Sequence, residues 1–123
     1  MPPANLIVFC EAGGASPFID WFGALPNHAK DKVTVRLRRL RELGHELRRP
    51  EADYLRDGIW ELRASIRGVH YRVLYFFHGR VAAVMAQGLV KERRVPDREI
   101  EIAVRRKALF EADPQRHTRE EIR

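Results

Sequence analysis

Basic residues gather at the ends of successive strand-like segments in the middle of this sequence. Arg63 and Arg72 lie in two consecutive segments, and the third is followed directly by Lys91 and Arg93. If the segments pair as neighbouring strands, these four side chains meet at one end of a small sheet. Clustered cations bind phosphate, and they stabilise the extra negative charge that develops during phosphoryl transfer. The sequence therefore predicts a phosphate site, and we expect the phosphate to belong to RNA.

Cleavage of RNA through its own 2′-hydroxyl requires an oriented nucleophile, stabilised charge at phosphorus and a proton for the leaving 5′-oxygen. Arg72 and its basic neighbours can stabilise the charge without a metal. His70 and Glu61 are candidates for moving protons, and Tyr71 is a candidate for stacking on a base. Each has a structural alternative: a solvated turn residue for His70, a salt-bridge partner for Glu61 and a core residue for Tyr71.

Length and composition bound the class of protein. The chain has 123 residues, enough for one core, and we expect a single domain over residues 1–123. A net charge of +6 favours a polyanion or an acidic protein partner. Cys10 is the only cysteine, and the five histidines show no metal-ligand spacing. Without a signal peptide or a long apolar run, we expect a cytoplasmic protein with no membrane contact, metal or cofactor.

Hydrophobic periodicity predicts one strand, two helices, three strands and a last helix, in that order. The expected segments are residues 6–10, 18–25, a helix ending near Leu43, and residues 59–66, 71–77, 80–88 and 97–110. Ser16 and Pro17 form a start signal for the first helix. The three consecutive strands read as an antiparallel meander, with helices covering one face. We therefore predict an α+β fold, β-α-α-β-β-β-α, with a loop over residues 45–57 and a frayed polar tail over residues 113–123.

Turn positions predict how the basic residues converge. A turn centred on Arg67-Gly68 sets Arg63 directly opposite Arg72. Like charges in that arrangement are unfavourable, so a bound anion between them explains the pair better than stability does. A longer loop would shift this register by one residue. The next turn, at His78-Gly79, brings residues 91–94 back beside the start of the central strand.

Three further arginines are candidates for RNA contact. Arg36 and Arg39 lie on the basic face of the second helix, and Arg94 follows Arg93. A solvated helix face is the structural alternative for the first two, and electrostatic contact with nucleic acid is the functional one.

In the order of its motifs, the chain resembles the RelE/HigB-like toxins of type II toxin–antitoxin systems. The resemblance is to the phage-derived HigB-like branch of the RelE/ParE superfamily, and it covers about residues 6–110. The matching segments are Trp21-Phe22, Leu25-Pro26, residues 40–45, Arg49-Pro50, residues 57–63, residues 71–75 and residues 88–103.

This resemblance implies a RelE-like α+β ribonuclease that cuts mRNA, typically on the translating ribosome. It also implies neutralisation by a cognate helix-turn-helix antitoxin, through which alone the toxin would meet operator DNA. Carried over by position, Arg72 matches the phosphate-stabilising arginine of the family, and Lys91 and Arg93 match its basic pair. Arg63 and Glu61 lie on the strand that supplies further polar residues in relatives.

Two other functions remain open from the sequence. Glu92 separates Lys91 from Arg93, whereas relatives have two adjacent lysines. That departure motivates a non-catalytic basic module that binds RNA or an acidic protein. The related ParE branch motivates the second alternative, an inhibitor of DNA gyrase.

Overall fold

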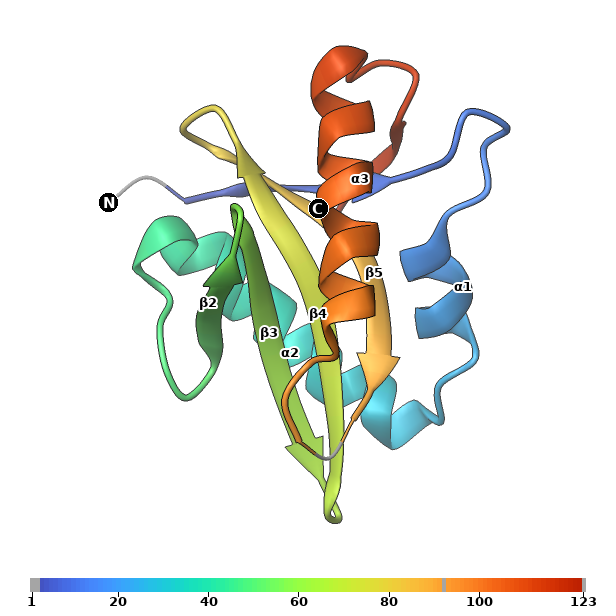
Figure 1. The fold of residues 1–123 in the computed structure, drawn as a ribbon. Helices are drawn as coiled ribbons and strands as arrows, with labels where there is room; N and C mark the ends of the chain where they lie inside the picture. Colours follow the sequence, from blue (N-terminus) through green and yellow to red (C-terminus); the bar gives the residue numbers. More distant parts are fainter. Residues whose placement is uncertain (1–2, 92, 123) are drawn as a thin grey trace.

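The computed structural model describes residues 3–91 and 93–122 (Figure 1). Its elements are β1 (Asn5–Phe9), α1 (Pro17–Gly23), α2 (Asn27–Leu43), the 3-10 helix η1 (Gly44–Glu46), β2 (Ala52–Arg56), β3 (Ile59–Ile66), β4 (Val69–His78), β5 (Ala82–Val90), α3 (Asp97–Ala112) and β6 (Thr118–Ile122). The predicted α+β class with its RelE-like order of elements is confirmed. No helix within the described residues is long and apolar enough to cross a membrane.

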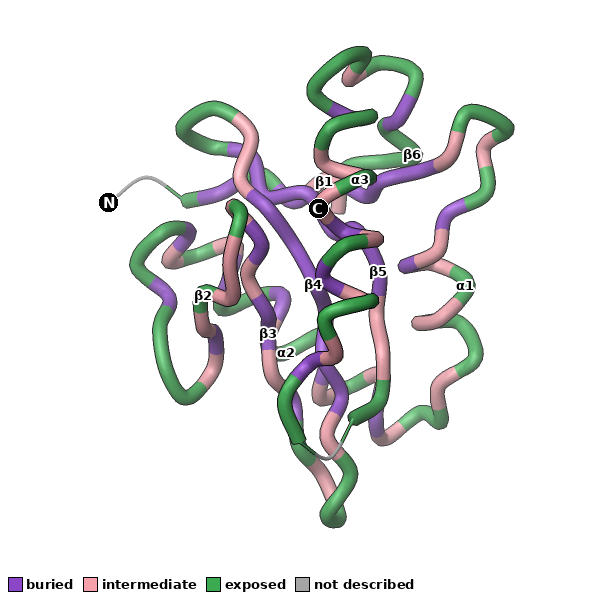
Figure 2. The backbone as a smooth tube through the Cα atoms, viewed as in Figure 1, coloured by how far each residue is buried: buried purple, intermediate pink, exposed green. Residues whose placement is uncertain are grey.

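The strands form one mixed sheet of six strands in the order β2-β3-β4-β5-β1-β6. The predicted meander, β3-β4-β5, is confirmed, and its neighbours pair antiparallel. β1 pairs parallel with β5 and antiparallel with β6, so the first strand of the chain lies inside the sheet. The central strands β4 and β5 are buried along most of their length (Figure 2).

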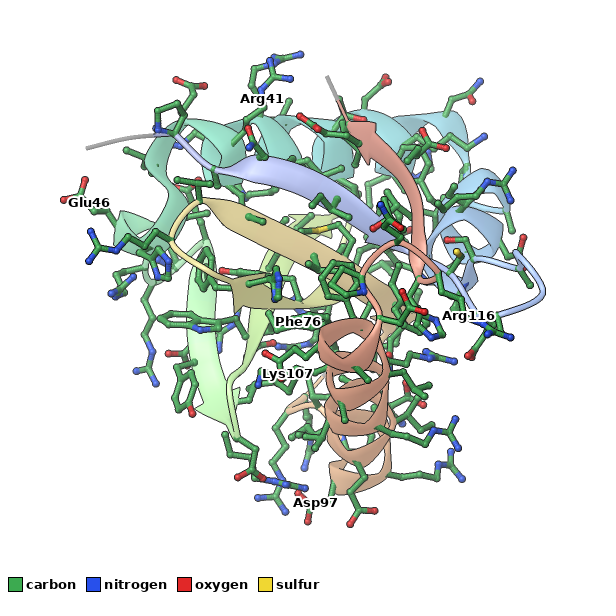
Figure 3. The ribbon with its side chains drawn as sticks, turned by 90° about the horizontal axis from the view of Figure 1, so that it is seen from above. Arg41, Glu46, Phe76, Asp97, Lys107 and Arg116 are labelled. Carbon is green, nitrogen blue, oxygen red and sulfur yellow. The ribbon has the colours of Figure 1, made fainter. Side chains whose placement is uncertain are left out.

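Helices cover both faces of the sheet, so the expectation that they share one face is wrong (Figure 3). α1 and α2 pack on the face that carries Val73 and Tyr75, whereas α3 packs on the face that carries Leu74 and Phe76. Phe76 meets Phe110 of α3 at 5.7 Å between ring centroids. Because β4 is apolar on both of its faces, each face requires a covering layer.

Two local features set the position of α1. Ser16 caps the helix, since its Oγ accepts a hydrogen bond from the Ile19 backbone N–H at 3.2 Å, and Pro17 follows as predicted. Trp21 then lies against β5 at Gly88, where a Cβ would overlap the indole ring. A glycine at this strand position therefore allows close approach of the helix.

The β3–β4 turn confirms the predicted register. Arg67 and Gly68 form the two-residue turn, with φ of 55° and 78°. Positive φ at both positions is the geometry of a type I′ hairpin turn. Arg63 consequently pairs with Arg72 and Ser65 pairs with His70. The like-charged pair that the sequence predicted is present.

Two segments that were expected to be irregular contain regular structure. The expected loop over residues 45–57 overlaps the end of η1 and includes β2, and β2 pairs with β3 although it lacks a regular apolar alternation. The expected frayed tail is also wrong, because residues 118–122 pair with β1 as β6. His117 anchors this tail: its ring stacks on Phe9, and its Nδ1 lies 2.8 Å from the Cys10 carbonyl oxygen. Such distant pairing leaves no local signal in the sequence.

Candidate functional site

A basic cleft of about 520 Å³ opens beside the β3–β4 hairpin. Its lining residues are Arg36, Pro50, Glu61, Arg63, Ser65, His70, Arg72 and Arg94. The loop before α3, which supplies Arg94, runs past the end of the hairpin that is distant from β1 (Figure 1). Four arginines around one small opening create a strong positive potential, which favours an anionic ligand.

A buried carboxylate links the two opposed arginines. Glu61 is only 2% exposed. Its Oε2 accepts a hydrogen bond from Arg63 Nη2 at 2.9 Å, and its Oε1 accepts one from Arg72 Nη1. A carboxylate is tolerated at this depth because both of its oxygens are paired with cations. Glu61 therefore fixes the positions of the two guanidinium groups, and the salt-bridge alternative predicted for it is present.

Arg72 is held from a second direction by the chain that follows β5. Its Nε donates to the Lys91 carbonyl oxygen at 3.4 Å, and the Lys91 backbone N–H donates to the His70 carbonyl oxygen at 3.0 Å. The predicted return of the chain to the start of β4 is therefore confirmed. Arg72 Nη2 makes no hydrogen bond within residues 3–91 and 93–122. Among the described residues, this donor is a candidate for contact with a ligand in the cleft.

Arg63 is tied to a second acidic residue. Its Nη2 lies 3.3 Å from Asp53 Oδ2, and Asp53 also binds Arg49 at 2.9 Å. The hydrogen bond from Arg49, followed by the nearby positive charges, lowers the pKa of Asp53. Arg63 Nε is buried and has no hydrogen-bond partner among the described residues. A buried donor without a partner is a candidate for contact with a ligand or water.

The two helix arginines have different surroundings. Arg36 reaches the cleft around the edge of the sheet, and its Nε donates to the Arg63 carbonyl oxygen at 3.0 Å. Arg39 instead donates two hydrogen bonds to Glu51, at 3.0 and 3.2 Å, and it does not line the cleft. These bonds lower the pKa of Glu51, with a further contribution from the charge of Arg36.

Tyr71 does not lie in the cleft. It is 6% exposed and packs in the core on the face covered by α1 and α2. Side chains alternate between the faces of a strand, so Arg72 on one face places Tyr71 on the other. Tyr71 is therefore a core residue, as its structural alternative predicted, and its ring is not exposed for stacking on a base.

His70 lies at the outer end of the cleft, next to a residue that sequence reasoning missed. Its Nδ1 is 2.7 Å from Ser65 Oγ, and the two residues are directly opposite each other on β3 and β4. The register that pairs Arg63 with Arg72 also pairs Ser65 with His70. The signal for Ser65 was therefore present in the predicted hairpin.

The remaining predicted cations line a second opening. Lys91, Arg93 and Arg94 are exposed and border a shallow hollow of about 680 Å³. Arg94 lines both this hollow and the cleft, whereas Lys91 and Arg93 line only the hollow. Glu92, the acidic residue between the two cations, lies outside the described residues. The structure thus divides the predicted cationic spot into two adjoining parts.

Comparison with known proteins adds a family to this geometry. A family model described as "Phage derived protein Gp49-like (DUF891)" matches residues 20–108. The matched region is well over half of the chain and contains all of the residues that line the cleft. No curated protein matches the chain.

Proposed function

The chain belongs to the Gp49-like family of phage-derived proteins, and we propose that it is the toxin of a toxin–antitoxin pair. Its proposed activity is cleavage of mRNA on the translating ribosome. The ordered resemblance to RelE/HigB-like toxins and the basic cleft both support this proposal. A cognate antitoxin with a helix-turn-helix domain would neutralise the toxin and provide its only contact with operator DNA.

The observation that carries the proposal is the opposed pair of Arg63 and Arg72, held by the buried carboxylate of Glu61. Two guanidinium groups facing one cleft can contact a single phosphodiester from two sides. They are fixed before substrate arrives, so little reorganisation accompanies the development of charge at phosphorus. Glu61 acts here as a positioning residue, because both of its oxygens are already bonded to arginine.

The adjoining hollow extends the proposed contact along the RNA. Lys91, Arg93 and Arg94 would bind phosphates that flank the cleaved linkage, and Arg36 would add charge from α2. Contacts of this kind release counterions, so RNA binding should weaken steeply as salt increases. In this proposal, Arg63 and Arg72 stabilise the charge at the phosphate that is cleaved. Lys91, Arg93 and Arg94 hold the RNA on either side of it.

Induced expression without an antitoxin tests the proposed function. Growth should stop, and primer extension should map new 5′ ends within translated mRNA. Arg72→Ala should relieve the arrest and remove the cuts. Arg38→Ala removes an exposed arginine of α2 outside the cleft, and it should leave both effects intact. Normal growth and intact mRNA in cells that contain folded wild-type protein would overturn the proposal.

Assays with purified protein test ribosome dependence, metal independence and the two alternative functions. Cutting that requires translating ribosomes supports ribosome dependence, whereas equal cutting of free mRNA contradicts it. Activity in the presence of EDTA is expected, because arginines are assigned the stabilising role. Salt-sensitive RNA binding without any cutting would favour the non-catalytic module. If the protein inhibits DNA supercoiling by gyrase and leaves mRNA uncut, the alternative function of gyrase inhibition is favoured.

A further inference from the structure

We infer that Ser65 is a positioning residue that orients His70 as the general base for attack by the RNA 2′-hydroxyl. This inference rests on the proposed ribonuclease function and names two roles within it. The carrying observation is the 2.7 Å contact between Ser65 Oγ and His70 Nδ1. Both residues line the same cleft as the opposed arginines.

The hairpin register places this pair next to the arginine pair. Ser65 is opposite His70, and Arg63 is opposite Arg72, two residues further from the β3–β4 turn on each strand. Residues two apart lie on the same face, and they are separated by roughly 7 Å along the strand. A ribose and its 3′-phosphate span a distance of this order. With the phosphate at the arginines, the 2′-hydroxyl falls toward His70.

The contact with Ser65 decides which nitrogen of His70 can act. If Nδ1–H donates to Ser65 Oγ, the lone pair belongs to Nε2, which then accepts a proton. The charged groups that line the cleft around His70 come from α2, β3, β4 and the loop before α3: Arg36, Glu61, Arg63, Arg72 and Arg94. Among the described residues that line the cleft, Glu61 is the only carboxylate, and arginine side chains bind both of its oxygens. His70 is therefore the group in the cleft that is best arranged to take a proton.

The proposed step balances as a transesterification. His70 Nε2 takes the proton from the 2′-hydroxyl while the 2′-oxygen forms a bond to phosphorus. The bond from phosphorus to the 5′-oxygen breaks, and the leaving oxygen takes a proton from water. The imidazolium then returns its proton to the solvent. The products are a 2′,3′-cyclic phosphate and a 5′-hydroxyl, and no oxidant, reductant or further reactant is required.

Nitrogen chemical shifts of the histidine rings test the geometry without any need for activity. In wild-type protein, the neutral ring of His70 should be the tautomer protonated at Nδ1. Ser65→Ala should lose this preference, and Ser65→Thr, which keeps the hydroxyl, should restore it. A wild-type ring protonated at Nε2 would overturn the inference.

Single-turnover cleavage across pH tests the chemical role. The wild-type rate should rise with pH and then level off, because a general base acts when it is neutral. His70→Gln should lower the plateau rate by roughly 100-fold or more and remove the rising limb. Ser65→Ala should lower the rate by roughly 10-fold and shift the rising part of the pH–rate profile. Ser65→Thr should restore the wild-type rate and the wild-type profile.

The outcomes distinguish this inference from the proposed function. If wild type cuts RNA and Arg72→Ala does not, while His70→Gln and Ser65→Ala keep the wild-type rate and pH profile, the inference fails and the function stands. If folded wild-type protein cuts no RNA under any of the conditions above, both fail together.

Discussion

Arg72 lies directly opposite Arg63 on the neighbouring strand, and one buried carboxylate binds both of their side chains. Like charges at this position destabilise a strand pair unless a counterion is present. In the protein without substrate, Glu61 supplies that counterion from within the chain. The same arrangement indicates where an added anion should bind.

Replacing Glu61 with glutamine should therefore destabilise the fold. The variant removes the charge that the two opposed guanidinium groups share and leaves only Asp53, next to Arg63, as a nearby carboxylate. We expect a loss of about 3 kcal/mol in the free energy of unfolding. Urea titration measures this value. Glu101→Gln, at an exposed position of α3, should change stability little.

Phosphate should partly restore the stability of Glu61→Gln. An anion that binds the folded state alone stabilises it by mass action, and removal of the internal carboxylate should strengthen anion binding between the arginines. The urea midpoint of the variant should rise with phosphate concentration by more than that of wild type. Equal shifts in the two proteins would contradict an anion site at Arg63 and Arg72.

Gly88→Ala should weaken the packing of α1 on β5. The added methyl group overlaps the ring of Trp21, so either the ring or the helix must move, at a cost of about 1–3 kcal/mol. Thermal or urea unfolding measures the loss. Gly23→Ala offers a matched control, because a Cβ at Gly23 meets no neighbouring atom and alanine favours the helix. A Gly88→Ala protein as stable as wild type would show that Trp21 adapts freely.

Tyr75→Phe should leave stability unchanged or raise it by up to about 1 kcal/mol. The Tyr75 hydroxyl is buried and has no hydrogen-bond partner within the described residues. Burial also raises the pKa of this hydroxyl, which therefore stays protonated at neutral pH. Tyr54→Phe is the contrasting change, because Tyr54 accepts a hydrogen bond from the Gly58 N–H at 2.9 Å. Its urea midpoint should fall, and a fall for Tyr75→Phe instead would reveal an internal partner.

Glu51 should link stability to acidic pH. Its pKa is lowered from the ordinary value of 4.5, first by the hydrogen bond from Arg39. A carboxyl with a lower pKa in the folded state contributes stability that is present above the unfolded pKa. That contribution to stability is lost as the pH falls through the pKa that Glu51 has in the folded state. The difference in urea midpoint between wild type and Glu51→Gln should accordingly be largest near pH 7 and shrink below pH 4.5.

The parts of the site that sequence predicted are those that depend on local turns. The Arg67-Gly68 turn fixed the register of β3 and β4, even though arginine is unusual at a position with positive φ. Once that register was correct, the opposition of Arg63 and Arg72 followed. The face of each side chain followed from strand alternation, which also explains why Tyr71 turned away from the cleft.

The missed parts depend on contacts between distant segments. β6 is formed by Thr118–Ile122, a polar sequence without apolar alternation, and only its pairing with β1 makes it a strand. The placement of α3 on the opposite face from α2 depends on which face of β4 each helix covers, and β4 is apolar on both. Periodicity alone does not distinguish such faces.

The position of β1 constrains when the molecule can finish folding. This strand is synthesised before both of its partners, β5 and β6, the latter ending at Ile122. The β3–β4 hairpin can form from nearby residues, whereas closure around β1 requires contacts of long sequence separation. Synthesis must therefore pass Thr118 before both edges of β1 are paired. A chain truncated before that point would leave β1 with one open edge, and an unpaired strand edge is a site at which chains aggregate.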